Sequence, residues 1–163
     1  MFGLTPLGIV HTAISLAAIV SGFWALARHG EISPRQPLGR TYLVCTLLAA
    51  ATALGIFRHG SFGPPHGLAI LTLLALAVGS VAAFTSVFGS WSRYVQAVAY
   101  SATFLFHMIP GFTETLTRLP PGQPLLPGAD APAFGPIYGV LLLVFVVGLT
   151  LQLRWLRRSP LAR

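Results

Sequence analysis

Charge is scarce in this chain. Only 8% of its 163 residues are charged, against about a quarter in an ordinary soluble domain. Lysine is absent, and the acidic residues are Glu31, Glu114 and Asp130 alone. So few charges could not cover the surface of a soluble protein of this length, whereas 55% of the residues are hydrophobic and the mean hydropathy is +0.78. We therefore expect lipid to be the solvent for most of one compact domain.

Cysteine is equally scarce, and the basic residues are unlike those of a nucleic-acid-binding protein. The one cysteine, Cys45, lies in an apolar run, so no intramolecular disulfide can form. The net charge of +7 comes from arginines that flank apolar runs, where positive charge sets the orientation of membrane helices. This placement argues against nucleic acid as a partner.

Five apolar stretches are long enough to cross a hydrocarbon core of about 30 Å, which takes about 20 helical residues. Pro110 is expected to kink or end the fourth stretch. The predicted fold is all-α, an integral membrane bundle of about five transmembrane helices. The spans cover residues 6–27, 40–57, 66–88, 94–114 and 136–153, and an outer loop covers residues 115–135.

The arginines divide unevenly between the two sides of such a bundle. Eight fall on the side of the C-terminus, and only Arg58 and Arg118 fall on the other. The positive-inside rule makes the arginine-rich side cytoplasmic. The N-terminus is then predicted outside and the C-terminus inside, with Trp24, Trp91 and Trp155 at the cytoplasmic interface.

Four of the five histidines fall in the outer half of this topology: His11, His59, His66 and His107. Ionisable side chains within membrane spans are expensive and mark candidate functional sites. Helical spacing of three and four residues gives two inward faces. One, on the fourth span, contains Tyr100, Thr103, His107, Gly111, Glu114 and Arg118; the other, on the first span, contains Gly8, His11, Ser15, Ala18 and Gly22.

Two chemistries would use these side chains. His11 and His107, on facing helices, could ligate the iron of haem b axially in a pocket lined by phenylalanines. Alternatively, zinc, iron or copper could be held by imidazole and one carboxylate. The ligands of that metal ion would be His11, His66, His107 and Glu114. The phenylalanines of the haem pocket would be Phe104, Phe106 and Phe112.

Simpler interpretations of the same residues stay open. A buried histidine can serve as a hydrogen-bonded contact between helices rather than as a ligand. Glu114 and Arg118 are four residues apart, the spacing of an ordinary helical ion pair. The small residues of the first span allow close helix approach, so this stripe is expected to be a packing face.

Several short segments resemble a bacterial family of multipass membrane proteins known as a domain of unknown function. They are His11, residues 22–26 (GFWAL), residues 39–42 (GRTY), Pro65-His66, and residues 106–120 from FHMIPG to ETLTRLP. The resemblance covers most of the chain. It implies the bacterial inner membrane and several helices, and it supplies no catalytic residues.

Three functions are consistent with these patterns. The first is a membrane protein that binds a metal ion or haem b in its outer half, for redox chemistry or metal handling. The second is a non-catalytic accessory subunit or assembly factor of a larger membrane complex, or a homo-oligomer. The third is a metal-dependent membrane hydrolase in which Glu114 acts as general base to a metal-bound water.

Overall fold

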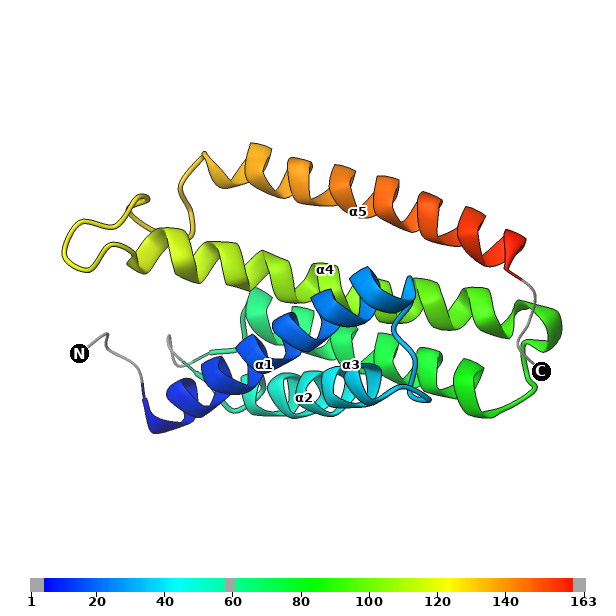
Figure 1. The fold of residues 1–163 in the computed structure, drawn as a ribbon. Coiled ribbons are helices and arrows are strands. Elements are labelled where there is room, and N and C mark those ends of the chain that lie inside the picture. Colours follow the sequence, from blue (N-terminus) through cyan, green and yellow to red (C-terminus); the bar gives the residue numbers. More distant parts are fainter. Residues whose placement is uncertain (1–4, 58–60, 160–163) are drawn as a thin grey trace.

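The structure is a computed structural model that describes residues 5–57 and 61–159. Each helix runs opposite to the one before it, and the start of α1 and the end of α5 lie at opposite ends of the bundle (Figure 1). The helices are α1 (Pro6–His29), α2 (Pro37–Ala53), α3 (Pro64–Phe84), α4 (Ser92–Arg118) and α5 (Phe134–Arg158), with a 3-10 turn η1 (Gly89–Trp91) before α4. These residues contain no strand, which confirms the all-α prediction.

Proline and glycine mark the helix ends for simple physical reasons. Helices α1, α2 and α3 begin with Pro6, Pro37 and Pro64. Proline is tolerated there because an N–H in the first turn has no hydrogen-bond partner within the helix. The N–H of Gly8 donates to Thr5 Oγ1 over 3.1 Å and caps α1. Gly30 ends that helix in the left-handed conformation, at φ 70°.

Three of the described helices, α1, α3 and α5, are long and apolar enough to cross a membrane. Helix α2 has 17 residues, a rise of about 26 Å. Helix α4 contains Arg93, Glu114 and Arg118. The structure therefore supports a membrane protein through three helices, and it contains two further helices that antiparallel packing places alongside them (Figure 1).

Pro110 was predicted to kink or end the helix, and it does not end it, because α4 continues to Arg118. Two threonine hydroxyls after Pro110 donate to backbone carbonyls four residues earlier. Thr113 bonds Ile109 and Thr115 bonds Gly111, over 2.8 and 2.7 Å. The carbonyl that Pro110 leaves without a helical N–H is a different one, that of Phe106, four residues before the proline. The predicted outer loop correspondingly shortens at both ends, and α5 begins at Phe134.

The stripe of small residues on α1 packs inside the bundle, as expected. Gly8, Ala18 and Gly22 are buried. A Cβ atom on Gly22 would lie 2.6 Å from a ring carbon of Tyr42 and 2.9 Å from one of Phe104. The missing side chain lets α1 approach α2 and α4 closely. This face is therefore occupied by sister helices and is not free for a partner.

Helix α5 is attached differently from the others. It packs mainly along α4 (Figure 1), and only Phe134, Gln152 and Leu156 of its residues are buried. Gln152 donates to the carbonyl of Gly30 over 2.8 Å and accepts from Ser101 over 2.8 Å. Two polar contacts near its C-terminal end thus connect α5 to α4 and to the end of α1.

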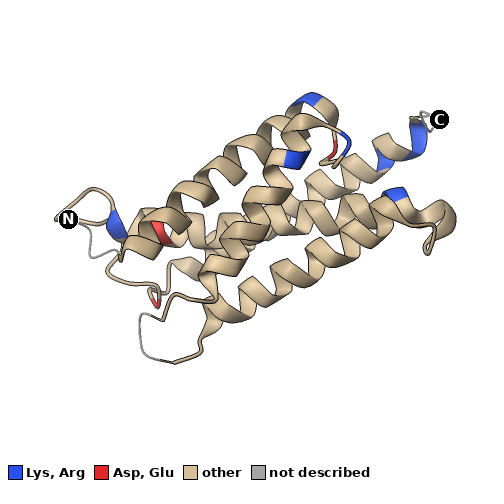
Figure 2. Ribbon diagram, turned by 90° about the horizontal axis from the view of Figure 1, so that it is seen from below, with Lys and Arg blue, Asp and Glu red and all other residues tan. Residues whose placement is uncertain are grey.

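Charge separates along the bundle (Figure 2). The ends of α1 and α5, the 30–36 connection and the starts of α2 and α4 lie at one end, called the arginine end. The end of α4, with Glu114 and Arg118, and the connection to α5, with Asp130, lie at the opposite end, called the histidine end (Figure 1). The three tryptophans belong to the arginine end and are exposed: Trp24, Trp91 and Trp155.

Candidate functional site

His11 is oriented by α2. Its Nδ1 lies 3.1 Å from the carbonyl oxygen of Ala49 and 3.0 Å from Thr52 Oγ1. Because a carbonyl can only accept, Nδ1 carries the proton and donates it. In the neutral ring Nε2 then keeps its lone pair, and its nearest described partner is Ser15 Oγ at 3.5 Å. His11 therefore has the tautomer and orientation of a histidine whose second nitrogen can ligate a metal.

His107 lies deeper, in a buried polar cluster shared by α2 and α4. Its Nε2 lies 3.1 Å from Thr46 Oγ1, and the Tyr42 hydroxyl lies 2.6 Å from Thr103 Oγ1. The Tyr42 ring meets the His107 ring edge-on, with centroids 6.1 Å apart. Tyr42, Thr46 and Thr103 are fully buried. We call these four residues the polar core, and each has a hydrogen-bond partner, as groups shielded from water require.

The two histidines are near neighbours in the fold. Both contact α2 three residues apart, since His11 lies against the Ala49 carbonyl and His107 against Thr46 Oγ1. Glu114 also forms an ion pair with Arg118 on the next turn of α4, as the spacing of four predicts. The structure thus brings together the predicted pair His11 and His107, with Glu114 on the exposed side of it.

His66 is placed apart from this pair by its own local contacts. It is 4% exposed, and its ring lies between Phe57 and Phe62, at centroid distances of 4.6 and 4.7 Å. The N–H of Gly63 donates to its Nδ1 over 3.2 Å, so the neutral ring carries its proton on Nε2. Ligation through Nε2 would require a proton shift to Nδ1 and loss of the Gly63 bond.

No group of three or more His, Cys, Asp or Glu side chains within residues 5–57 and 61–159 is arranged to hold a metal ion. The four predicted ligands are therefore not gathered in this fold, and His59 lies outside the described residues. A bare zinc site generally uses three or four protein ligands, whereas haem iron needs only two axial ligands. Bare-ion binding and metal-dependent hydrolysis would both need more ligands than the two histidines.

The three phenylalanines expected around a porphyrin take different positions. Phe104 packs against the hydrophobic core and against the Tyr42 ring, at a centroid distance of 6.3 Å. Phe106 is half-buried and Phe112 is 42% exposed. Only Phe104 therefore lies against the polar core within the bundle.

Two functional positions escaped the sequence interpretation. Thr46 is the hydrogen-bond partner of His107, and Gln152 connects three helices. Both could have been found: Tyr42, Thr46 and Ala49 recur at steps of four and three, and Gln152 is a polar residue within an apolar run. Threonine is common in membrane helices, which makes its signal weak.

Comparisons with known proteins give no family. No protein-family model, no curated protein and no solved structure matches this chain. The proposed resemblance to a multipass bacterial family therefore stays a prediction, and function has to be argued from the site.

Proposed function

We propose that this chain is a bacterial inner-membrane protein whose five helices all cross the bilayer, and that His11 and His107 hold haem b near the outer surface for electron transfer. The observation that carries the proposal is the hydrogen bond from His11 Nδ1 to the Ala49 carbonyl. It fixes the ring so that Nε2 can act as a ligand, which is how proteins orient metal-binding histidines. The nearby His107 supplies the second imidazole from another helix.

His107 would exchange one contact on binding the cofactor. Its Nε2 now lies within hydrogen-bond distance of Thr46 Oγ1, so ligation through that atom would release the threonine hydroxyl. Thr46 could then bond a backbone carbonyl of its own helix, as Thr52 does with Leu48 over 2.8 Å. Haem would supply one-electron chemistry, and the protein would tune it through burial and through the bond to His11.

A visible spectrum of the full chain, purified from haem-replete cells, tests this proposal. We expect a Soret band that shifts on reduction and that is lost or altered in His11→Ala and in His107→Ala. His29→Ala, at the arginine end, is the matched control and should leave the band unchanged. Thr46→Val should also keep the band, because it removes only the bond that ligation would release. A colourless wild-type protein would exclude haem binding.

The orientation is tested by fusion proteins. The proposal places the arginine end in the cytoplasm, so a reporter that is active only in the periplasm should be silent when fused after Arg158. The same reporter inserted within residues 119–133 should be active. The reverse result would move both histidines to the cytoplasmic side and would contradict the outer location of the site.

A second function, that of an accessory subunit, is favoured by a different observation. Gly135, Gly139 and Gly148 on α5 have open space where a Cβ atom would be, and most of that helix is exposed. Small residues allow another membrane helix to approach closely. Since the α1 stripe is filled by α2 and α4, α5 is the helix through which this chain would join a larger complex or a second copy.

A further inference from the structure

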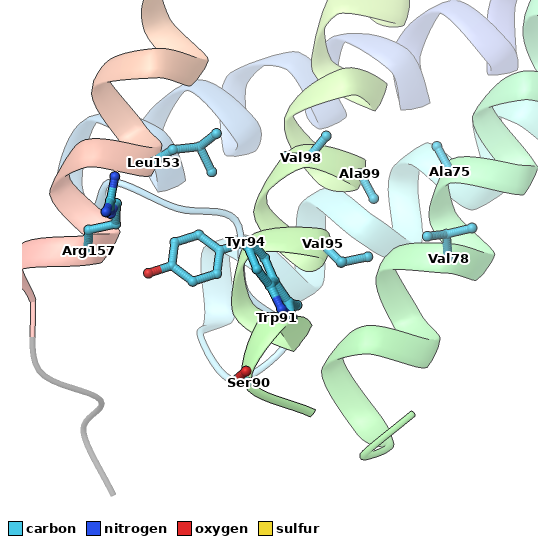
Figure 3. A pocket seen from close by; sticks show the side chains of 10 residues that line it. All are labelled: Ala75, Val78, Ser90, Trp91, Tyr94, Val95, Val98, Ala99, Leu153 and Arg157. Atoms are coloured by element: carbon cyan, nitrogen blue, oxygen red, sulfur yellow. The ribbon is translucent and has the colours of Figure 1, made fainter. Parts of the chain in front are cut away.

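A groove opens at the arginine end, away from the histidines. It has a volume of about 1040 Å³ and is walled by α3 and α5, with α4 as its floor (Figure 3). It exists because α3 and α5 both pack on α4. Ala75 and Val78 line one wall, Leu153 lines the other, and Val98 and Ala99 form the floor. The lining is apolar over most of its length.

One end of this groove is polar and carries positive charge. Arg157 from α5 lines the groove, and Trp91 and Tyr94 lie at the same end, with ring centroids 5.9 Å apart (Figure 3). Tryptophan and tyrosine favour the level of the lipid headgroups. The groove therefore has the polarity of a phospholipid, with an apolar length and a cationic end in the position of a headgroup.

The charge at this end is not neutralised by nearby acids. Glu31 belongs to the arginine end, and its carboxylate lies 3.5 Å from Nε of Arg93. Arg93 is further held by the carbonyl of Ser159 at 3.3 Å and by the Trp155 ring at 5.5 Å. Glu114, near the end of α4, and Asp130, in the connection before α5, belong to the histidine end. Within the described part of the chain, no ion pair is recorded for Arg157.

We propose that this groove binds one anionic phospholipid, with an acyl chain against Val78 and Val98 and the phosphate at Arg157. Basic pockets between membrane helices recognise anionic headgroups in this way. The charge at Arg157 distinguishes this occupant from a neutral lipid or a quinone, which would gain nothing from an unpaired guanidinium. The site is separate from any haem between α1 and α4, because its walls are α3 and α5 and it lies at the other end of the bundle.

Fluorescence quenching by brominated lipids tests the proposal, because Trp91 lines the groove. The variant Trp24→Phe/Trp155→Phe leaves Trp91 as the reporter. In phosphatidylcholine nanodiscs, phosphatidylglycerol with brominated acyl chains should quench Trp91 at about a fivefold lower mole fraction than brominated phosphatidylcholine does, the effect of one arginine near an anionic group. Arg157→Gln should remove this preference. Arg158→Gln, one residue along α5, is the control and should keep it.

Other outcomes would overturn the proposal. Equal quenching by both lipids would mean that the groove holds ordinary bulk lipid. Equal loss of the phosphatidylglycerol preference in Arg157→Gln and Arg158→Gln would mean that the preference comes from the general positive charge of the surface. Absence of quenching would mean that protein, such as a second copy, fills the groove, and displacement by a neutral quinone would assign the site to quinone.

Native mass spectrometry of the chain with all its tryptophans gives a second measurement. One phosphatidylglycerol should stay bound, and Val98→Phe, which fills the floor, should release it.

Discussion

Helices α3 and α5 each contain an apolar stretch of 18 residues with the same mean hydropathy, 2.3. In α3, 33% of this stretch is buried inside the bundle, whereas in α5 only 6% of it is buried. The difference lies in where their small and polar residues stand. On α3 the buried residues recur at steps of three and four, and they are His66, Ala69, Thr72, Leu76, Gly79 and Ala82. On α5 they are few and lie at its two ends. Hydropathy identifies a helix that can lie in a membrane, whereas the spacing of small residues along the helix determines which face packs against other helices.

Replacing one glycine on each helix should give the largest difference between them. A Cβ atom on Gly79 would collide with the ring of Tyr100, whereas one on Gly148 would meet nothing within 4 Å. We expect Gly79→Leu to lower the free energy of unfolding by about 3 kcal/mol, the upper range for overpacking a core. Gly148→Leu should cause no loss, because leucine favours helix more than glycine does. Denaturant unfolding in detergent micelles measures both.

Equal destabilisation by these two substitutions would contradict the comparison. It would mean that the face of α5 around Gly148 is packed in the folded protein. The conservative variants Gly79→Ala and Gly148→Ala serve as a second pair if Gly79→Leu fails to fold, since alanine adds only the colliding Cβ atom.

The attachment of α5 should depend on one side chain, with a smaller effect. Gln152 bonds both Gly30 and Ser101 over 2.8 Å in a buried position. Gln152→Leu keeps the size and removes both bonds, at a cost of about 1 kcal/mol, since polar contacts between membrane helices are individually modest. Because the polar core is elsewhere, the loss should appear as separation of α5 from α4. Spin labels near the end of α5 and the start of α4, the ends closest to Gln152, would measure that distance.

Ser101→Ala removes one of these two bonds and should give a smaller displacement than Gln152→Leu. A Gln152→Leu protein with an unchanged distance between the labels would show that apolar contacts at Phe134 and Leu156 suffice to hold α5.

The sequence could predict features that depend on local periodicity, but not features that depend on the conformation of a connection. Long apolar runs predicted every helix, and the α1 stripe predicted a packing face correctly, because both depend on local periodicity. Depth and face predicted that His11 and His107 would lie near one another, and both contact α2, at Ala49 and Thr46. The position of His66 could not be predicted, since it depends on Gly63, Phe57 and Phe62 in a connection whose conformation no periodicity specifies. Nor did Pro110 reveal that the helix would continue to Arg118, because a helix can continue past a proline when its surroundings support it.

The smallest effect on stability belongs to the substitution that is most informative about function. Gly139 lies in open space on α5, four residues from Gly135, and Gly139→Leu should leave the free energy of unfolding of the isolated chain almost unchanged. If α5 joins a larger complex, the same substitution should release the chain from it, because leucine keeps a partner helix from approaching closely. Co-purification from native membranes measures this release. The combined variant His11→Ala/His66→Ala/His107→Ala should stay bound in that case, since the histidine end does not contribute to the contact. A complex that keeps Gly139→Leu but fails to function with the histidine variant would instead make the histidine pair the function and leave α5 facing lipid.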